Sequence, residues 1–211
     1  MKMEGIIFDV DGTLWDSTGI VADAWNHAIA QAGIEGKIVT ATDLKKLFGK
    51  TMKVIAEELL PKQSETKRKE IMDLCCEYEH AALMQNEQDI TYQNVSKTIQ
   101  ELAKQYKLFI VSNCQSGYIE LFLDKTGLHS YITDIECYGN TGRPKGDNIR
   151  LVVERNHLLS AVYVGDTAGD YEAAQQAEVP MVFAEYGFGE LPENSEVYAI
   201  IHTFADLMEL F

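Results

Sequence analysis

Two aspartates near the start of the chain, Asp9 and Asp11, follow a short apolar run at residues 6–8 and precede Gly12. The apolar run predicts a buried strand, and the glycine predicts the turn that ends it. Side chains two positions apart on an extended chain point to the same side, so the two carboxylates converge. Such a pair repels unless a cation lies between them, and Mg²⁺ accepts oxygen ligands of this kind. One aspartate can then attack a phosphoryl group while the other moves the proton.

A second pair of aspartates, Asp166 and Asp170, lies four positions apart near the other end of the chain. The apolar run at residues 162–164 and Gly165 predict a buried strand and a turn, which leaves the aspartates at a helix start. Taken alone, each of them could be only a helix N-cap. Ligands of α/β proteins bind beyond the carboxyl ends of the strands, and that is where the site is expected.

Residues 9–13 read DVDGT and resemble motif I of the haloacid dehalogenase (HAD) superfamily, while residues 165–170 read GDTAGD and resemble its motif IV, GDxxxD. The resemblance implies that Asp9 is the nucleophile and forms an aspartyl-phosphate intermediate. It also implies that Asp11 protonates the leaving oxygen, then activates water, and meets the metal through its backbone carbonyl. Thr13 is implied to bind phosphate.

The same resemblance implies Mg²⁺ as the cofactor. The implied metal residues are Asp9, Asp11, Asp166 and Asp170, of which Asp166 binds the ion directly. Asp170 binds it through a water molecule or instead orients Lys145.

Ser112 and Asn113 follow an apolar run at residues 108–111, where another strand is expected to end. A hydroxyl at such a place, with the backbone N–H groups beyond it, can hold a phosphate oxygen. Taken alone, the two residues are more typical of a plain turn. On the second core strand they resemble motif II of the family, which implies that both bind phosphate.

A basic residue should neutralise Asp9 and the phosphate, and two residues compete for this role. Many members of the family carry Lys-Pro-x-Pro, whereas residues 142–147 here read GRPKGD. Alignment on Pro144 would give the role to Arg143, and a shifted loop would give it to Lys145. We favour Lys145 because a compact ammonium suits a crowded carboxylate site better than a planar guanidinium.

Strand-like runs that mostly alternate with helical patterns predict the elements that position these residues. The alternation indicates an α/β fold with a Rossmann-like parallel sheet and helices on both faces. The expected strands are residues 5–9, 108–112, 132–137, 162–166, 181–184 and 197–201, and the expected core helices are residues 94–106, 118–126 and 149–155, with a last short helix capped by Thr203.

The chain between the first two strands reads mostly as helix. Ser17 or Thr18 could begin a first helix, and further helices are expected at residues 42–48, at residues 50–60 and from Ser64 to about residue 85. The family resemblance implies that this insert is an all-helical cap that closes over the site. The expected core domain comprises residues 1–15 and 89–211, and the expected cap comprises residues 16–88.

Lys50 lies between two expected cap helices, in the run Gly49-Lys50-Thr51. Hydrolases of the resembled kind use a glycine-containing cap loop to meet the leaving group. A lysine there could bind a carboxylate or a second phosphate of the substrate, which the negative charge of the chain would otherwise repel. A solvated lysine at a helix start is an equally open interpretation.

Composition narrows the choice of partners. The formal net charge of −15 argues against nucleic acid, and no run of about 18 apolar residues predicts a membrane span. With no leader-like N-terminus and no metal spacing among its cysteines, the chain is expected to be a cytoplasmic protein with reduced thiols. We expect a small phosphorylated metabolite as its partner and a monomer or homodimer as its state. The cysteines are Cys75, Cys76, Cys114 and Cys137.

Asp11 separates the reactions of the superfamily. By resemblance, dehalogenase and phosphonatase members lack an aspartate at this position, so its presence points to phosphate esters. Over its whole length the chain resembles phosphoglycolate phosphatase-like hydrolases with a helical cap. Phosphoryl transfer of the β-phosphoglucomutase kind is the main alternative, and a phosphate-binding regulator with little turnover is a further one.

Overall fold

The computed structural model describes residues 3–211 and has a six-stranded parallel sheet at its centre, with strand order β3-β2-β1-β4-β5-β6. The central strand β1 pairs with β2 on one side and with β4 on the other. The predicted α/β fold with a Rossmann-like parallel sheet is therefore confirmed. The strands are β1 (Gly5–Phe8), β2 (Lys107–Ser112), β3 (Asp134–Cys137), β4 (Ala161–Gly165), β5 (Met181–Ala184) and β6 (Ala199–Ile201).

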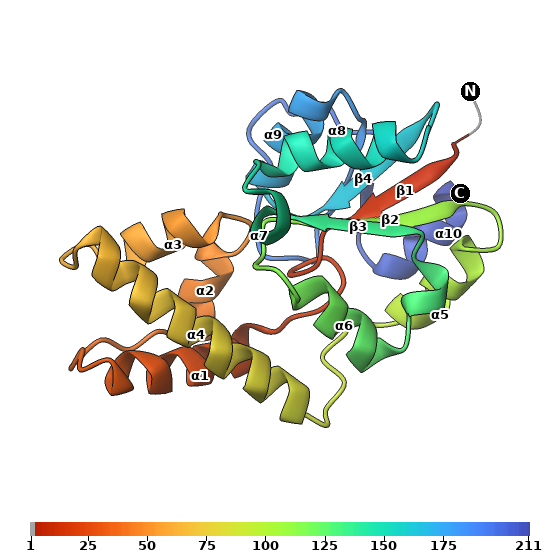
Figure 1. The fold of residues 1–211 in the computed structure, drawn as a ribbon. Coiled ribbons are helices and arrows are strands. Elements are labelled where there is room, and N and C mark those ends of the chain that lie inside the picture. The colour runs from red at the N-terminus through yellow and green to blue at the C-terminus, as the bar shows by residue number, and fades with distance from the viewer. Residues whose placement is uncertain (1–2) are drawn as a thin grey trace.

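Helices cover both faces of this sheet, which explains why its central strands are apolar throughout. Alternate residues face opposite sides: Ile7, Phe109 and Tyr163 belong to one buried cluster, and Phe8 and Ile110 belong to the other. Figure 1 shows α8 and α9 on one side of the sheet and α5, α6 and α10 on the other. These helices are α5 (Val95–Leu102), α6 (Tyr118–Thr126), α8 (Lys145–Arg155), α9 (Ala168–Ala177) and α10 (Leu207–Leu210).

Four helices form a second unit beside the sheet, on the left in Figure 1. The first and the last of these helices pack together, and Trp25 of the first donates a hydrogen bond to Glu79 of the last. Ser64 caps the last helix by accepting a hydrogen bond from the backbone N–H of Lys67. We call this unit the cap; its helices are α1 (Thr18–Gln31), α2 (Ala41–Leu47), α3 (Met52–Leu59) and α4 (Glu65–Gln85).

The chain leaves the core and returns to it along two paired connections. The backbone N–H of Asp16 donates to the carbonyl of Ile90 at 3.0 Å, and that of Tyr92 donates to Leu14 at 3.0 Å. All four cap helices fall inside the expected range 16–88, and the domain boundaries themselves stay a prediction.

Several element boundaries differ from those expected. Helix α8 begins at Lys145 and not at residue 149. Hydrophobic periodicity did not predict this first turn, because its buried residues, Lys145, Gly146 and Asn148, are not apolar. The expected helix at 94–106 ends at Leu102, and β3 begins at Asp134, two residues after the expected start at residue 132. Short helical turns not expected from the sequence are η1 (His129–Tyr131) and α7 (Tyr138–Thr141), and η2 (Phe204–Asp206) precedes α10.

Within residues 3–211, none of the helices combines the length and the apolar character that crossing a bilayer requires.

Candidate active site

The carboxyl ends of three neighbouring strands meet at one edge of the sheet. Phe8 of β1 is in register with Ile110 of β2 and with Val164 of β4. The polar residues at these strand ends, Asp9, Ser112 and Asp166, therefore come together as expected for a site at this edge.

Lys145 contacts two of the predicted carboxylates. Its Nζ lies 3.0 Å from Asp9 Oδ1 and 2.6 Å from Asp170 Oδ1, and the side chains of all three residues are buried. Arg143 is exposed, and its backbone N–H donates to Thr141 Oγ1. Of the two competing basic residues, the structure brings Lys145 to the site.

The electrostatics of these groups follow from burial and from the single lysine. Burial raises the pKa of Asp9 to about 6, against the lowering effects of Lys145 and the Ser112 hydroxyl. Burial also opposes ionisation of Asp170, but Lys145 and hydrogen bonds from Thr167 outweigh it and lower its pKa. The pKa of Lys145 is raised because the two carboxylates outweigh its burial, so the lysine stays charged.

Asp166 is held tightly from both sides. Thr13 Oγ1 donates to its Oδ1 at 3.1 Å, and the backbone N–H of Phe188 donates to its Oδ2 at 2.7 Å. The backbone at Gly12 approaches so closely that a Cβ there would lie 2.1 Å from Asp166 Oδ2, and its φ of +86° also favours glycine. In this conformation the Thr13 hydroxyl positions a carboxylate, and its predicted role in phosphate binding stays a prediction.

Asp9, Asp166 and Asp170 form a cluster that fits a divalent cation. Their ligand oxygens lie within 4.8 Å of one another, and all three residues are buried. The pKa of Asp166 is raised well above its usual range by burial and by the charges of Asp170 and Asp9. With Lys145 as the partner of two of them, the three carboxylates retain an excess of negative charge. Buried carboxylate oxygens with unbalanced charge are the donor set that Mg²⁺ binds.

Asp11 faces a different set of partners. Its Oδ1 accepts hydrogen bonds from Ser17 Oγ at 2.6 Å, Tyr118 OH at 2.8 Å and Trp15 Nε1 at 2.9 Å. Burial raises the pKa of Asp11 to about 7, and these donors and Asp9 adjust it in opposite directions. Because Oδ1 already accepts three bonds, a proton on this carboxyl group would sit on Oδ2. Asp11 is thus held as a group that can be protonated near neutral pH.

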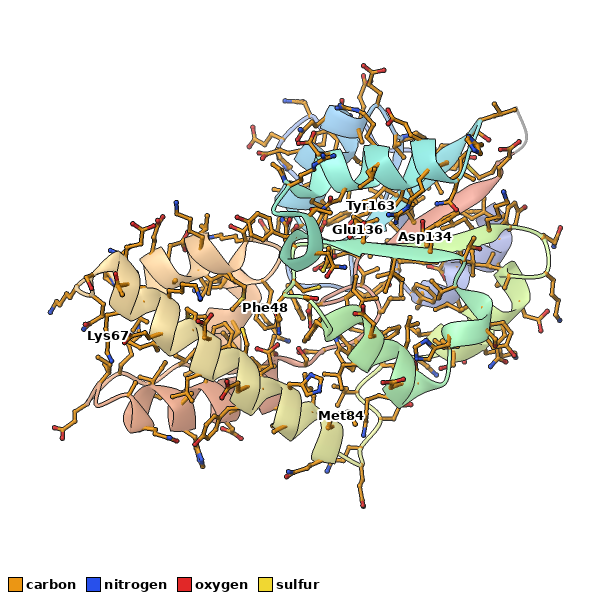
Figure 2. All side chains as sticks on the ribbon, viewed as in Figure 1. Phe48, Lys67, Met84, Asp134, Glu136 and Tyr163 are labelled. Atoms are coloured by element: carbon orange, nitrogen blue, oxygen red, sulfur yellow. The ribbon has the colours of Figure 1, made fainter. Side chains whose placement is uncertain are left out.

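The cap reaches the site through the loop at Gly49. Asn113 Nδ2 donates to the carbonyl of Gly49 at 2.8 Å, so this predicted phosphate-binding residue links core and cap. Phe48, labelled in Figure 2, lies at the junction, with its ring centroid 6.3 Å from that of Trp25 and 6.5 Å from that of Phe188. Core and cap therefore touch directly above the strand ends.

Lys50 lies beside this loop but is turned to another partner. Its Nζ binds both carboxylate oxygens of Glu58, at 2.9 and 2.8 Å, and its side chain is 39% exposed. The predicted role of Lys50 in substrate binding stays a prediction, and in this arrangement the lysine is neutralised by a neighbour in the cap.

The family model of the haloacid dehalogenase-like hydrolases matches residues 6–184 of this chain. The chain belongs to this family. All predicted site residues lie inside the matched range, and the expectation of a HAD-like hydrolase is confirmed.

Relatives of this HAD-like hydrolase span nearly its whole length. The phosphoglycolate phosphatase of Agrobacterium fabrum is 28% identical over 211 residues, which cover 95% of this chain and 89% of the relative. The crystal structure of a predicted phosphoglycolate phosphatase from Haemophilus somnus has a TM-score of 0.86 at 21% identity, covering 100% of this chain and 98% of that one. CbbY from Rhodobacter sphaeroides, solved with xylulose-(1,5)bisphosphate, has a TM-score of 0.82 at 19% identity, covering 98% and 96% of the two chains.

Sequence reasoning missed several polar residues that complete the site of this HAD-like hydrolase. Trp15 and Tyr118 were not expected to hold Asp11, and Ser17 was expected only as a possible helix cap. Tyr163, whose hydroxyl donates to Asp170 Oδ1 at 3.2 Å, read only as part of an apolar strand. Glu79 of α4 is 3% exposed and accepts hydrogen bonds beside Asp11, although it lies in a helix with many charged residues. Of these missed residues, only Tyr163 had a signal in the sequence, since a polar hydroxyl is unusual in a buried apolar strand.

Proposed function

We propose that this HAD-like hydrolase cleaves small phosphomonoesters with Asp9 as the nucleophile and Mg²⁺ as the cofactor. The observation that carries the proposal is the placement of Asp9, which is buried at the end of β1 between Lys145 and the other two carboxylates of the metal-type cluster. The phosphoglycolate phosphatases among its relatives, similar over nearly the whole chain, support the same reaction class.

In the first step an oxygen of Asp9 bonds to phosphorus as the bond from phosphorus to the ester oxygen breaks. Asp11 gives its proton to the departing oxygen, so the alcohol leaves neutral and Asp9 carries an acyl phosphate. In the second step Asp11, now ionised, takes a proton from water while the water oxygen bonds to phosphorus. Asp9 leaves as a carboxylate, inorganic phosphate is released, and both aspartates return to their starting states.

The surrounding residues stabilise charge and position. Lys145 offsets the negative charge of Asp9 and of the phosphoryl oxygens, and Asp170 with Tyr163 holds the lysine in place. Asp9, Asp166 and the backbone carbonyl of Asp11 would hold Mg²⁺, with Asp170 acting through water. When bound, the cation supplies electrostatic stabilisation of the phosphoryl oxygens. Ser112, whose hydroxyl forms a hydrogen bond that lowers the pKa of Asp9, would hold a phosphoryl oxygen beside it.

The substitution Asp9→Asn tests this function because it keeps the shape of the side chain and removes the nucleophile. We expect kcat for p-nitrophenyl phosphate to fall about a thousandfold or more, measured as release of phosphate. Asp124→Asn, at an exposed residue paired with His129, is the matched control and should keep full activity. Substantial turnover by folded Asp9→Asn would refute the nucleophile.

The acceptor of the phosphoryl group distinguishes hydrolysis from mutase-like transfer. Equal amounts of inorganic phosphate and alcohol are expected from hydrolysis, whereas transfer to a second sugar site releases no phosphate. Borohydride trapping during turnover should convert the acyl phosphate on Asp9 to homoserine, which peptide mass spectrometry detects.

A further inference from the structure

A pocket of about 30 Å³ lies between the cap and the core, and Asp9 and Asp11 line it. A space of this size holds about one or two water molecules, so a phosphomonoester enters only when the cap moves away from the core. When the cap closes again, the leaving group of the substrate must lie against the residues of the cavity wall. Those residues include Trp25, Phe48, Glu79 and Asn113.

Glu79 places a carboxylate in this wall. It lies on α4 with 3% of its surface exposed, and each of its oxygens accepts one bond at 2.7 Å, from Trp25 Nε1 and from Gln115 Nε2. A carboxyl group keeps more acceptor positions than these two bonds use, so it has capacity for further donors. The two donors fix the carboxylate at the boundary of cap and core.

Asn113 adds a second acceptor to the same wall. Its Nδ2 donates to the carbonyl of Gly49, and this bond fixes the orientation of the amide. Its Oδ1 is buried and has no hydrogen-bond partner within residues 3–211. A buried acceptor without a donor is costly, so a ligand that supplies a donor at this position gains from it.

The charge of the wall excludes one kind of leaving group. Among the cavity-lining residues, all within 3–211, Lys50 is the single cation, and its ammonium is bound by both oxygens of Glu58. A carboxylate or second phosphate on the leaving group would therefore face the acceptor oxygens of Glu79 and Asn113 with no free positive charge to meet it. An anionic group that is buried without a cation or enough hydrogen-bond donors is costly, so such a leaving group is disfavoured.

We propose that Glu79 and Asn113 recognise the alcohol portion of the substrate, and that this alcohol carries hydroxyl or ammonium donors and no further anionic group. The proposal rests on the phosphomonoesterase function proposed above and narrows its substrate class. It places phosphoglycolate, whose alcohol carries a carboxylate, among the poor substrates of this chain, although several of its relatives bear that name.

Four phosphomonoesters test the proposal: glycerol 3-phosphate, O-phosphoethanolamine, phosphoglycolate and p-nitrophenyl phosphate. The wild-type protein should show a kcat/KM for glycerol 3-phosphate or for O-phosphoethanolamine about tenfold or more above that for phosphoglycolate. A higher kcat/KM for glycerol 3-phosphate would indicate that the site recognises hydroxyl groups, and a higher value for O-phosphoethanolamine would indicate that it recognises an ammonium group. Turnover of p-nitrophenyl phosphate, which offers no donor, reports on the phosphatase function alone. If that turnover is absent, the proposed function fails, whatever the selectivity.

Glu79→Gln and Glu77→Gln form a matched pair, because Glu77 is an exposed residue on the same helix. Glu79→Gln should reduce the ratio of kcat/KM between the donor-bearing substrate and phosphoglycolate about tenfold, while Glu77→Gln should leave it unchanged. Calorimetric binding of the same esters to Asp9→Asn, with Mg²⁺ present, gives a readout without turnover. Preference of the wild type for phosphoglycolate, or equal losses on every ester in Glu79→Gln, would overturn the proposal, as would tighter binding of phosphoglycolate to Asp9→Asn.

Discussion

Lys145 shows how one residue can decide the chemistry of a site. It brings one buried positive charge to two of the three buried carboxylates of the cluster. Removal of one partner from a buried ion pair leaves the other charges without compensation, which costs more than the pair itself contributes. The lysine therefore matters both for catalysis and for keeping Asp9 in its reactive, ionised form.

We expect Lys145→Ala to lower kcat about a hundredfold or more, because the charge that offsets the developing anion is lost. The kcat of Arg143→Ala should stay within about twofold of wild type, since Arg143 is exposed and bonds Thr141 and Asn148 only through its backbone. Steady-state kinetics on p-nitrophenyl phosphate would measure both, with circular dichroism to establish that Lys145→Ala is folded. A larger loss in Arg143→Ala would reverse the assignment.

The site residues that could be predicted from the sequence are those whose position follows from the residues next to them in the chain. Asp9 and Asp166 each follow a buried strand directly, so strand pairing alone brings them together. Lys145 against Arg143 was a question of loop register, which only the path of the chain into α8 answers. Glu79 and Tyr118 could not be predicted as site residues, because their positions depend on how α4 and α6 pack over the strand ends.

Glu79 also gives the stability of the protein a defined pH dependence. Burial raises its pKa from 4.5 to about 7, against the lowering effect of its two donors. The folded state thus holds a proton that the unfolded state has lost, and stability falls as pH rises through this window. From about pH 5.5 to pH 8, we expect wild type to lose about 2 kcal/mol of unfolding free energy relative to Glu79→Gln. Urea titrations of both proteins would measure it, and a difference that does not change with pH would contradict the burial of an ionisable group.

At the scale of elements, the loop between α2 and α3 makes one of the contacts between the cap and the core. Gly49 has a φ of +86°, and a Cβ at this position would lie 3.2 Å from Thr167 Oγ1 of the core. Its carbonyl accepts the bond from Asn113. The loop therefore contacts the core through the backbone at Gly49 and the ring of Phe48, and neither contact uses the side chain of Lys50.

Gly49→Ala and Gly36→Ala together separate the effect of the contact between the loop and the core from the effect of backbone strain alone. Gly36 lies in the α1–α2 loop at a φ of +72° with no atom within 4 Å of its would-be Cβ. Both substitutions should cost about 1–2 kcal/mol in unfolding free energy, since a left-handed backbone disfavours alanine. Only Gly49→Ala should also lower kcat/KM, by about fivefold or more, because the methyl group displaces the loop from Thr167. Equal kinetics for the two variants would show that this contact does not position the cap.

The elements themselves were largely predictable, and the errors have a common cause. Apolar periodicity predicted the strands and the long cap helices, because their buried faces are apolar. It failed at the start of α8, where the buried residues are polar or glycine and Lys145 belongs to the site, and around α7, a short turn with no buried residue. The boundaries of the expected cap remain a prediction, although the paired connections at Asp16 and Ile90 suit a hinge between two units.

At the scale of the whole molecule, the net charge of −15 means that cations are attracted to the surface as well as to the site. Surface carboxylates attract cations weakly and are screened by salt, whereas the buried cluster of Asp9, Asp166 and Asp170 concentrates its charge in a small volume. A cation that binds the folded state and not the unfolded one stabilises the protein by mass action. Thermal stability is therefore a measure of this cluster that does not depend on turnover.

We expect millimolar Mg²⁺ to raise the Tm of the wild-type protein by several degrees at constant ionic strength, since about 1 kcal/mol shifts the Tm of a domain of this size by about 2–4 °C. Asp166→Asn should abolish this shift, because it removes the carboxylate that Thr13 and Phe188 hold in the cluster. Asp124→Asn removes the same charge from the surface and should keep the shift, so it separates binding at the cluster from general screening. Differential scanning calorimetry with matched NaCl would measure all three proteins. A shift that survives in Asp166→Asn, or one that Na⁺ reproduces, would mean that the cluster is not the metal site.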